Sequence, residues 1–222
     1  MDALFVSNLP ADAATWTKLG LYLGSFDPLH LGHEWVAGRL LERCGRVLLV
    51  VPGRHFDKSI RPGENASLGQ RLVMIERFAR RAGGPVLGGV AGEVLFVRLA
   101  ARAAALFPRA GITFGMGDDT YARLLRSPEY FARAGLTWTE TDAGTLDFLR
   151  RTALVFGRRQ DGPGRLRVPD DLREVSSTRV RTAVAALRGD PRHAVARLQG
   201  LRTLVSPDIL ESVRNAQTDS YD

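Results

Sequence analysis

A short apolar segment followed by a turn and then by helical spacing constrains this chain more than any other feature. Residues 19–23 are apolar and bounded by glycine, which predicts a buried strand of a parallel sheet. A proline and a glycine then interrupt the chain, and residues 34–44 place apolar side chains at helical spacing. His30 and His33 therefore stand where a strand passes into a helix. In an open α/β sheet this edge is where ligands bind, and the free N–H groups of a helix N-terminus favour an anion.

The same alternation of short apolar strands and amphipathic helices continues along the chain. Further strands are predicted at 46–51, 85–92, 112–116, 153–157 and 166–168. Further helices are predicted from Ser67, which has capping-box spacing to Gln70, and near 95–107, 120–125, 130–134, 177–188 and 207–216. The stretch between 134 and 151 shows no clear period, and residues 1–18 are either an extra edge element or an N-terminal extension. We expect one α/β domain over 19–222, a doubly wound parallel sheet with a small helical C-terminal part from about 175.

Composition limits the classes of partner and compartment. The net charge of +7 suits an anionic partner, but arginine is spread through almost every segment. A nucleic-acid binder more often has a basic stripe with interleaved aromatics, so no nucleic-acid partner is expected. We find neither a run of about 20 apolar residues nor a signal peptide, and expect no membrane attachment. The single cysteine, Cys44, suits a reducing cytoplasm.

The two histidines admit three interpretations on their own. Zinc binding needs a third ligand, and the remaining histidines, His55 and His193, have no ligand-like spacing around them. The imidazoles could simply cap or pack against the helix. The third interpretation is that two imidazole N–H groups at a helix start, beside a glycine, stabilise a phosphate that gains charge during a reaction. Their neighbours favour this last one.

Residues 24–33, Gly-Ser-Phe-Asp-Pro-Leu-His-Leu-Gly-His, resemble the signature of the nucleotidyltransferase superfamily. Residues 175–181, Val-Ser-Ser-Thr-Arg-Val-Arg, are similar to the Ile-Ser-Ser-Thr-x-Ile-Arg motif of nicotinate or nicotinamide mononucleotide adenylyltransferases. Alone, the second motif would be an ordinary Ser/Thr helix cap. The resemblance implies a Rossmann-like fold, with residues 24–33 and 175–181 both at the bound ATP.

The resemblance also implies which residues contact the substrates. Gly117-Asp118-Asp119 is similar to the family's Gly-x-Asp, with Asp119 holding the ATP ribose, Asp118 as the alternative, and helix capping as the structural explanation for both. The implied catalytic residues are His30, His33 and Arg181. The implied ATP-binding residues are Gly24, Ser25, Phe26, His30, His33, Gly117, Asp119, Ser176, Ser177, Thr178 and Arg181. The implied mononucleotide-binding residues are Ser25, Phe26, Lys58 and Trp138, and no protein-bound metal is implied.

The implied reaction is adenylyl transfer from ATP to nicotinate or nicotinamide mononucleotide, releasing pyrophosphate, with Mg²⁺ carried by the ATP phosphates. One alternative is another transferase of the superfamily, acting on phosphopantetheine or a cytidylyl acceptor. The other is a non-catalytic nucleotide sensor, which the apolar Val94-Leu95-Phe96 segment would permit because the bacterial family has threonines there. The choice between acid and amide stays open, as does assembly into a homo-oligomer.

Overall fold

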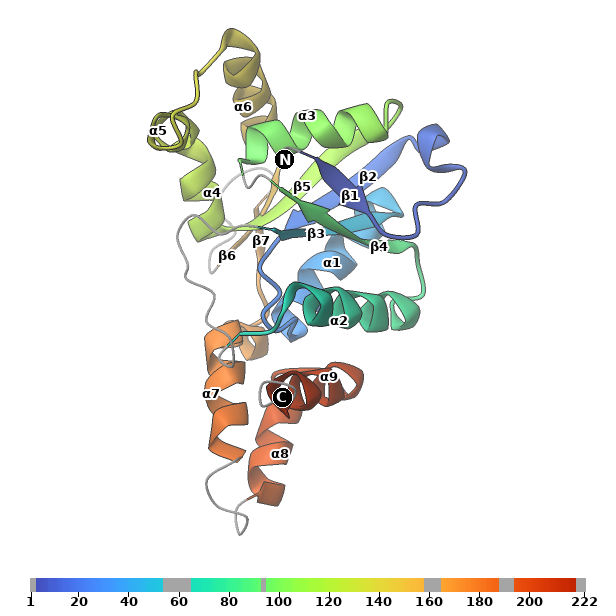
Figure 1. Cartoon of the computed structure of the whole chain (residues 1–222), viewed down its shortest axis with the longest axis vertical. Helices are drawn as coiled ribbons and strands as arrows, with labels where there is room; N and C mark the ends of the chain where they lie inside the picture. Colours follow the sequence, from blue (N-terminus) through green and yellow to red (C-terminus); the bar gives the residue numbers. More distant parts are fainter. Residues whose placement is uncertain (1–2, 54–64, 93–94, 158–164, 188–193, 219–222) are drawn as a thin grey trace.

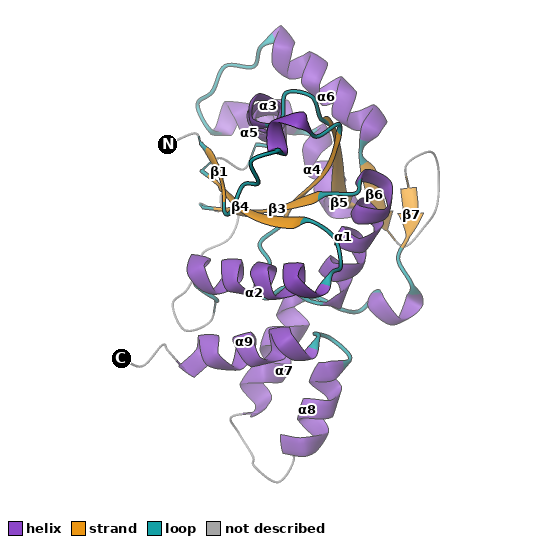
Figure 2. Ribbon diagram, turned by 90° about the vertical axis from the view of Figure 1, so that its right-hand side faces the viewer, coloured by secondary structure: helices purple, strands orange, loops and turns teal. Residues whose placement is uncertain are grey.

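The protein is built on a twisted sheet with helices on both faces (Figures 1 and 2). The computed structural model describes residues 3–53, 65–92, 95–157, 165–187 and 194–218. Within them the sheet has seven strands in the order β1-β4-β3-β2-β5-β6-β7, all parallel to their neighbours except β1, which runs antiparallel to β4. The strands are β1 (Leu4–Val6), β2 (Lys18–Leu23), β3 (Val47–Pro52), β4 (Val86–Ala91), β5 (Gly111–Gly117), β6 (Leu154–Gly157) and β7 (Arg165–Arg167).

The helices form two layers and a separate C-terminal group. Helices α1 and α2 cover one face of the sheet, α3 and α6 cover the other, and α7 to α9 gather beyond α2 (Figure 2). The helices are α1 (Leu31–Cys44), α2 (Leu68–Arg81), α3 (Phe96–Leu106), α4 (Asp118–Leu125), α5 (Ser127–Arg133), α6 (Glu140–Thr152), α7 (Ser177–Leu187), α8 (Ala194–Arg202) and α9 (Pro207–Thr218). Short 3₁₀ turns lie at Ala13–Thr15 and Asp170–Leu172.

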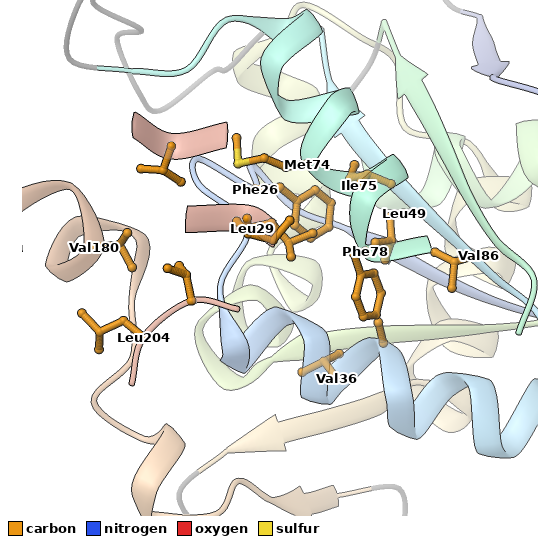
Figure 3. Close-up of a cluster of buried hydrophobic side chains, with 14 of the residues drawn as sticks. Phe26, Leu29, Val36, Leu49, Met74, Ile75, Phe78, Val86, Val180 and Leu204 are labelled. Atoms are coloured by element: carbon orange, nitrogen blue, oxygen red, sulfur yellow. The ribbon is translucent and has the colours of Figure 1, made fainter. Parts of the chain in front are cut away.

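Each face of the sheet contributes to its own hydrophobic core. All six residues of β3 are buried, and successive side chains alternate between the cores, with Leu49 in one and Leu48 in the other. The core on the α1 and α2 face continues past α2 to Val180 of α7 and to Leu204 (Figure 3). The C-terminal helices therefore share a core with the sheet.

Helix α1 approaches the sheet closely because two strands carry glycine beneath it. A Cβ on Gly20 would lie 2.9 Å from the Cβ of Leu40, and one on Gly115 would lie 2.7 Å from its Cδ1. Leu40 is completely buried between the two strands. The glycines of β2 and β5 thus determine how deeply the helix that carries the histidine motif is seated.

The predicted alternation of strands and helices is confirmed, and with it the doubly wound α/β class. The Ser67–Gln70 capping box is also present, with both of its hydrogen bonds. Two helices were not predicted, α6 and α8, and the stretch before residue 18 contains the edge strand β1. The end of the helix predicted over 177–188 lies outside the described residues.

Candidate active site

The first turn of α1 is closed by its own two histidines. His30 is the N-cap, and its Nδ1 accepts a hydrogen bond from the N–H of His33 at 3.4 Å. The Nδ1 of His33 accepts in return from the N–H of His30 at 3.3 Å. The pair thus makes the reciprocal contacts of a capping box with imidazoles in place of Ser/Thr and Glu/Gln. The capping interpretation of the histidines is therefore correct for their Nδ1 atoms.

This capping decides which ring nitrogen carries the proton. A nitrogen that accepts from a backbone N–H has no hydrogen of its own, so each neutral imidazole must carry its proton on Nε2. The two rings stack with centroids 3.6 Å apart. Burial lowers the pKa of His30 to about 4, so this ring is neutral near pH 7. The arrangement presents two adjacent rings, each able to donate from Nε2.

Two glycines leave room for the rings at this turn. A Cβ on Gly32 would lie 3.1 Å from Cε1 of His30, and a Cβ on Gly24 would lie 2.9 Å from the ring of Phe26. Phe26 has a φ of 45°, an uncommon backbone conformation for a bulky residue. Its ring is completely buried and meets His33 edge-on at 5.0 Å.

The aromatic ring of Phe26 points into the core rather than toward a ligand. Figure 3 shows Phe26 and Leu29 among Met74 and Ile75 of α2. Any contact between Phe26 and a substrate would therefore involve its backbone. Ser25, just before it, is half-buried at the same turn.

Asp27 joins the turn to α2 and α7. Its buried carboxylate accepts from the N–H of Ala66 at 2.8 Å and from the side-chain amide of Asn65. Arg181 of α7 lies 3.5 Å from the same carboxylate and also donates to the Asp27 carbonyl oxygen. Asp27, in the first motif, thus contacts both the second motif and the residues just before α2.

The start of α7 packs directly against residues 24–33, which we call the histidine turn. Ser177 donates its hydroxyl hydrogen to the carbonyl oxygen of Pro28 at 3.1 Å. Ser176 caps the helix by accepting from the N–H of Arg179, and Thr178 accepts from Arg181 at 3.2 Å. Thr178 is exposed and Arg181 half-buried. Two motifs about 150 residues apart in sequence therefore form one continuous surface.

The two aspartates after β5 face different neighbours. Asp118 bonds Arg165 of β7 at 3.0 Å, and its carboxylate occupies the space where a Cβ on Gly157 would be. Asp119 pairs with Arg123 at 2.8 Å on its own helix and is largely exposed. Burial, and then the charge of Asp119, raise the pKa of the Tyr22 hydroxyl. Asp118 is therefore tied to β7, whereas Asp119 pairs within its own helix and its charge acts on Tyr22 of β2.

One predicted site residue, Trp138, is not brought to this surface. Trp138 packs edge-on against Phe131 at 4.8 Å in the core on the opposite face of the sheet. Lys58 lies outside the described residues.

Two polar residues at the site were not predicted. Asp27 stands inside the first motif but was given no role. Arg71 is 2% exposed and donates to the carbonyl oxygen of Ala66 at 2.8 Å. Burial lowers the pKa of Arg71, and the charge of Asp27 opposes this effect. A sequence signal existed, since Arg71 has helical spacing to Ile75 and Phe78 on the buried face of α2.

The described residues contain neither a cluster of metal ligands nor a membrane-spanning helix. No group of three or more His, Cys, Asp or Glu in the described residues gathers as a metal site would require. Among the helices described, none is both long and apolar enough to cross a membrane.

Comparison with known proteins assigns the chain to a family. The model of the cytidylyltransferase-like family matches residues 21–183, which include the histidine turn, both aspartates and the start of α7. The chain belongs to the cytidylyltransferase-like family. Helices α8 and α9 lie beyond the matched residues.

Proteins similar to this chain carry the names of nucleotide adenylyltransferases. A probable nicotinate-nucleotide adenylyltransferase of Maridesulfovibrio salexigens is 31% identical over 109 residues, which are 46% of this chain and 50% of the relative. The match thus spans about half the length of the curated relative. The structure also resembles a Plasmodium falciparum nicotinic acid mononucleotide adenylyltransferase, solved with NaAD and with APC. Each solved chain has a TM-score of 0.61 and 14% identity, over 93% of this chain and 98% of its own. At that identity the structural likeness shows a common fold.

Proposed function

We propose that this protein transfers the adenylyl group of ATP to nicotinate mononucleotide, forming the dinucleotide and pyrophosphate. An oxygen of the acceptor phosphate attacks the α-phosphorus of ATP, and the bond from that phosphorus to the oxygen bridging the β-phosphate breaks. The acceptor phosphate is already anionic near neutral pH, so the reaction needs no general base. Positioning of the two substrates and stabilisation of the developing charge are then the main tasks of the protein.

The observation that carries the proposal is the contact of the start of α7 with the residues just before the histidine pair, from Ser177 to Pro28 and from Arg181 to Asp27. Imidazoles that donate from Nε2 suit the α-phosphate as it gains charge, and they are fixed in direction by the capping box. Arg181, Thr178 and the first turn of α7 offer a guanidinium fork, a hydroxyl and backbone N–H groups for the β- and γ-phosphates.

The ribose of ATP is assigned to Asp119. Its carboxylate is largely exposed and pairs with Arg123 on its own helix, whereas Asp118 is tied to Arg165 of β7 and is less exposed. A carboxylate accepts hydrogen bonds from two vicinal hydroxyls and repels phosphate, which suits a ribose.

We infer that a divalent cation enters with ATP. Since the described residues hold no cluster of three metal ligands, phosphate oxygens and water would supply most of its coordination, as is usual for Mg²⁺. The cation would neutralise charge on the leaving pyrophosphate.

The identity of the acceptor rests on the names of the relatives and on residues 175–181. Incubating the full chain with ATP, Mg²⁺ and nicotinate mononucleotide should give the deamido dinucleotide together with an equal amount of pyrophosphate. Parallel reactions with nicotinamide mononucleotide, with phosphopantetheine, and with CTP in place of ATP test the alternatives. Product only with phosphopantetheine or CTP would contradict the proposal, and ATP binding without product from any acceptor would identify a nucleotide sensor.

A further inference from the structure

The N-terminus of α1 is also held by a turn from the far end of the chain. Leu31, the first residue of α1, donates its N–H to the carbonyl oxygen of Leu204 at 3.0 Å. Leu204 stands between α8 and α9, and we call residues 204–208 the C-terminal turn. Leu204 and Val205 are buried in the same core as Phe26 and Leu29. The turn is thus seated beside the histidine turn by apolar packing and by one backbone hydrogen bond.

A polar network fixes the other side of the same helical turn. Glu34, directly after His33, has a side chain only 9% exposed. Its Oε1 accepts from the Ser206 hydroxyl at 2.7 Å and from Arg81 Nη2 at 2.8 Å. Arg81 comes from the last turn of α2, and it also donates to Ser206 and contacts Asp208. Charge-assisted hydrogen bonds of this kind are directional and are strengthened by burial.

These contacts bracket the histidine pair along α1. Leu31 is held immediately after His30, and Glu34 immediately after His33, so neither end of the first turn can shift alone. The stacked rings depend on that turn for their hydrogen bonds. A movement of α1 would therefore change the direction of both Nε2 atoms.

We propose that Glu34, Ser206 and Arg81 are positioning residues, through which the C-terminal turn aligns the histidine pair for phosphate chemistry. The expected change in kcat rests on the proposed function. The expected change in the geometry of the histidine pair rests on the ligand-free structure alone. The family match ends at residue 183, so the C-terminal turn lies outside the matched residues.

The chain offers matched controls at the same interface. Ser212 lies on α9, is buried like Ser206, and its hydroxyl has no hydrogen-bond partner among the described residues. Glu211 of α9 pairs with Arg77 of α2 at 2.7 Å, as Glu34 pairs with Arg81. Among the described residues, neither control side chain makes a hydrogen bond or ion pair with α1. Ser212→Ala and Glu211→Gln therefore make the same chemical changes without touching the histidine turn.

The test combines kinetics with histidine NMR on the full chain. Ser206→Ala and Glu34→Gln should lower kcat about tenfold to a hundredfold, as small misplacements of reacting groups do, with little change in the KM for ATP. Long-range ¹H–¹⁵N spectra of the ligand-free protein should show the Nδ1 and Nε2 signals of His30 and His33 shifted in these variants and unshifted in both controls. The melting temperatures of the variants and controls show whether a lower kcat comes from misaligned histidines or from a less stable fold.

Two results would overturn the inference. One is a kcat and imidazole spectrum for Ser206→Ala and Glu34→Gln that match those of Ser212→Ala and Glu211→Gln. The other is a loss of activity at unchanged imidazole signals. If the wild-type protein makes no dinucleotide, the proposed function fails, while the NMR comparison still decides whether the C-terminal turn aligns the histidines.

Discussion

Asp118 and Asp119 are adjacent in sequence and differ in surroundings, which makes them a matched pair for testing the ribose assignment. Asp119→Asn should raise the KM for ATP about tenfold, because a hydrogen bond to a charged group contributes about 1.5 kcal/mol. Asp118→Asn should weaken the contact with Arg165 and change the KM for ATP far less. Steady-state kinetics with the acceptor saturating would measure both. A larger increase in the KM for ATP from Asp118→Asn would assign the ribose contact to Asp118 instead.

His30 should make the stability of the fold depend on pH. Its pKa is about 4 in the folded protein and near 6.5 when unfolded, so the unfolded chain binds the extra proton between these values. The free energy of unfolding should therefore fall as the pH drops from about 6.5 towards 4, by roughly 3 kcal/mol in all from this group. Above about pH 7 the contribution should be constant.

Urea unfolding of the wild-type protein and of His30→Gln across this pH range isolates the effect. The variant lacks the titrating group, so its unfolding free energy should fall less steeply below pH 6.5. Parallel curves for the two proteins would show that His30 is not the group responsible.

At the scale of the elements, the seating of α1 on β2 and β5 depends on glycine. Gly20→Ala places a methyl group 2.9 Å from the Cβ of Leu40, which belongs to a helix that cannot move without disturbing the histidine turn. Overpacking of this kind should destabilise the fold by about 1–3 kcal/mol. Gly38→Ala, within α1 and with nothing within 4 Å of the added methyl, should instead stabilise by about 0.5–1 kcal/mol. Chemical denaturation compares the two, and equal effects would contradict this account of helix seating.

The helices that were not predicted have weak local signals. Thr139 and Asp142 make a capping box at the start of α6, but only two side chains of that helix are buried, one of them polar. The apolar residues of α8 do not gather on one face. A helix such as α8, with so little amphipathic pattern, is held mainly by tertiary contacts, which a sequence does not display.

At the scale of the whole molecule, the site exists because distant segments meet. An ATP analogue with a methylene group between the α- and β-phosphates should stabilise the protein by about 2.7 kcal/mol at a hundred times its Kd. At the same analogue concentration, Arg181→Met should show about 1.4 kcal/mol less stabilisation for each tenfold loss of affinity. Arg179→Met is the control, because Arg179 is exposed and donates to the Glu174 carbonyl rather than to the histidine turn. Thermal unfolding with and without the analogue measures this, and equal losses in the two variants would remove Arg181 from the triphosphate site.

Most of the strands and helices could be predicted from the sequence, and so could most of the residues able to take part in chemistry. Apolar runs, helical spacing and the Ser67 capping box are local patterns, and local patterns set strands, helices and caps directly. The residues around His30, Asp119 and Ser177 were identified because they lie in short motifs that resemble those of a known family. Their roles towards substrates stay predictions.

The contacts of residues 24–33 could not be predicted in this way, because they depend on the tertiary structure. Capping by both imidazoles, the burial of Phe26 and the contact of Asp27 with Arg181 all depend on where α2, α7 and the C-terminal turn lie. Those placements follow from the burial of apolar surface between segments that are distant in sequence. The same packing brings together polar partners such as Glu34 and Ser206, which are about 170 residues apart. The physical reason is that a hydrogen bond between such segments has no local sequence pattern, because its partners meet only when the core forms.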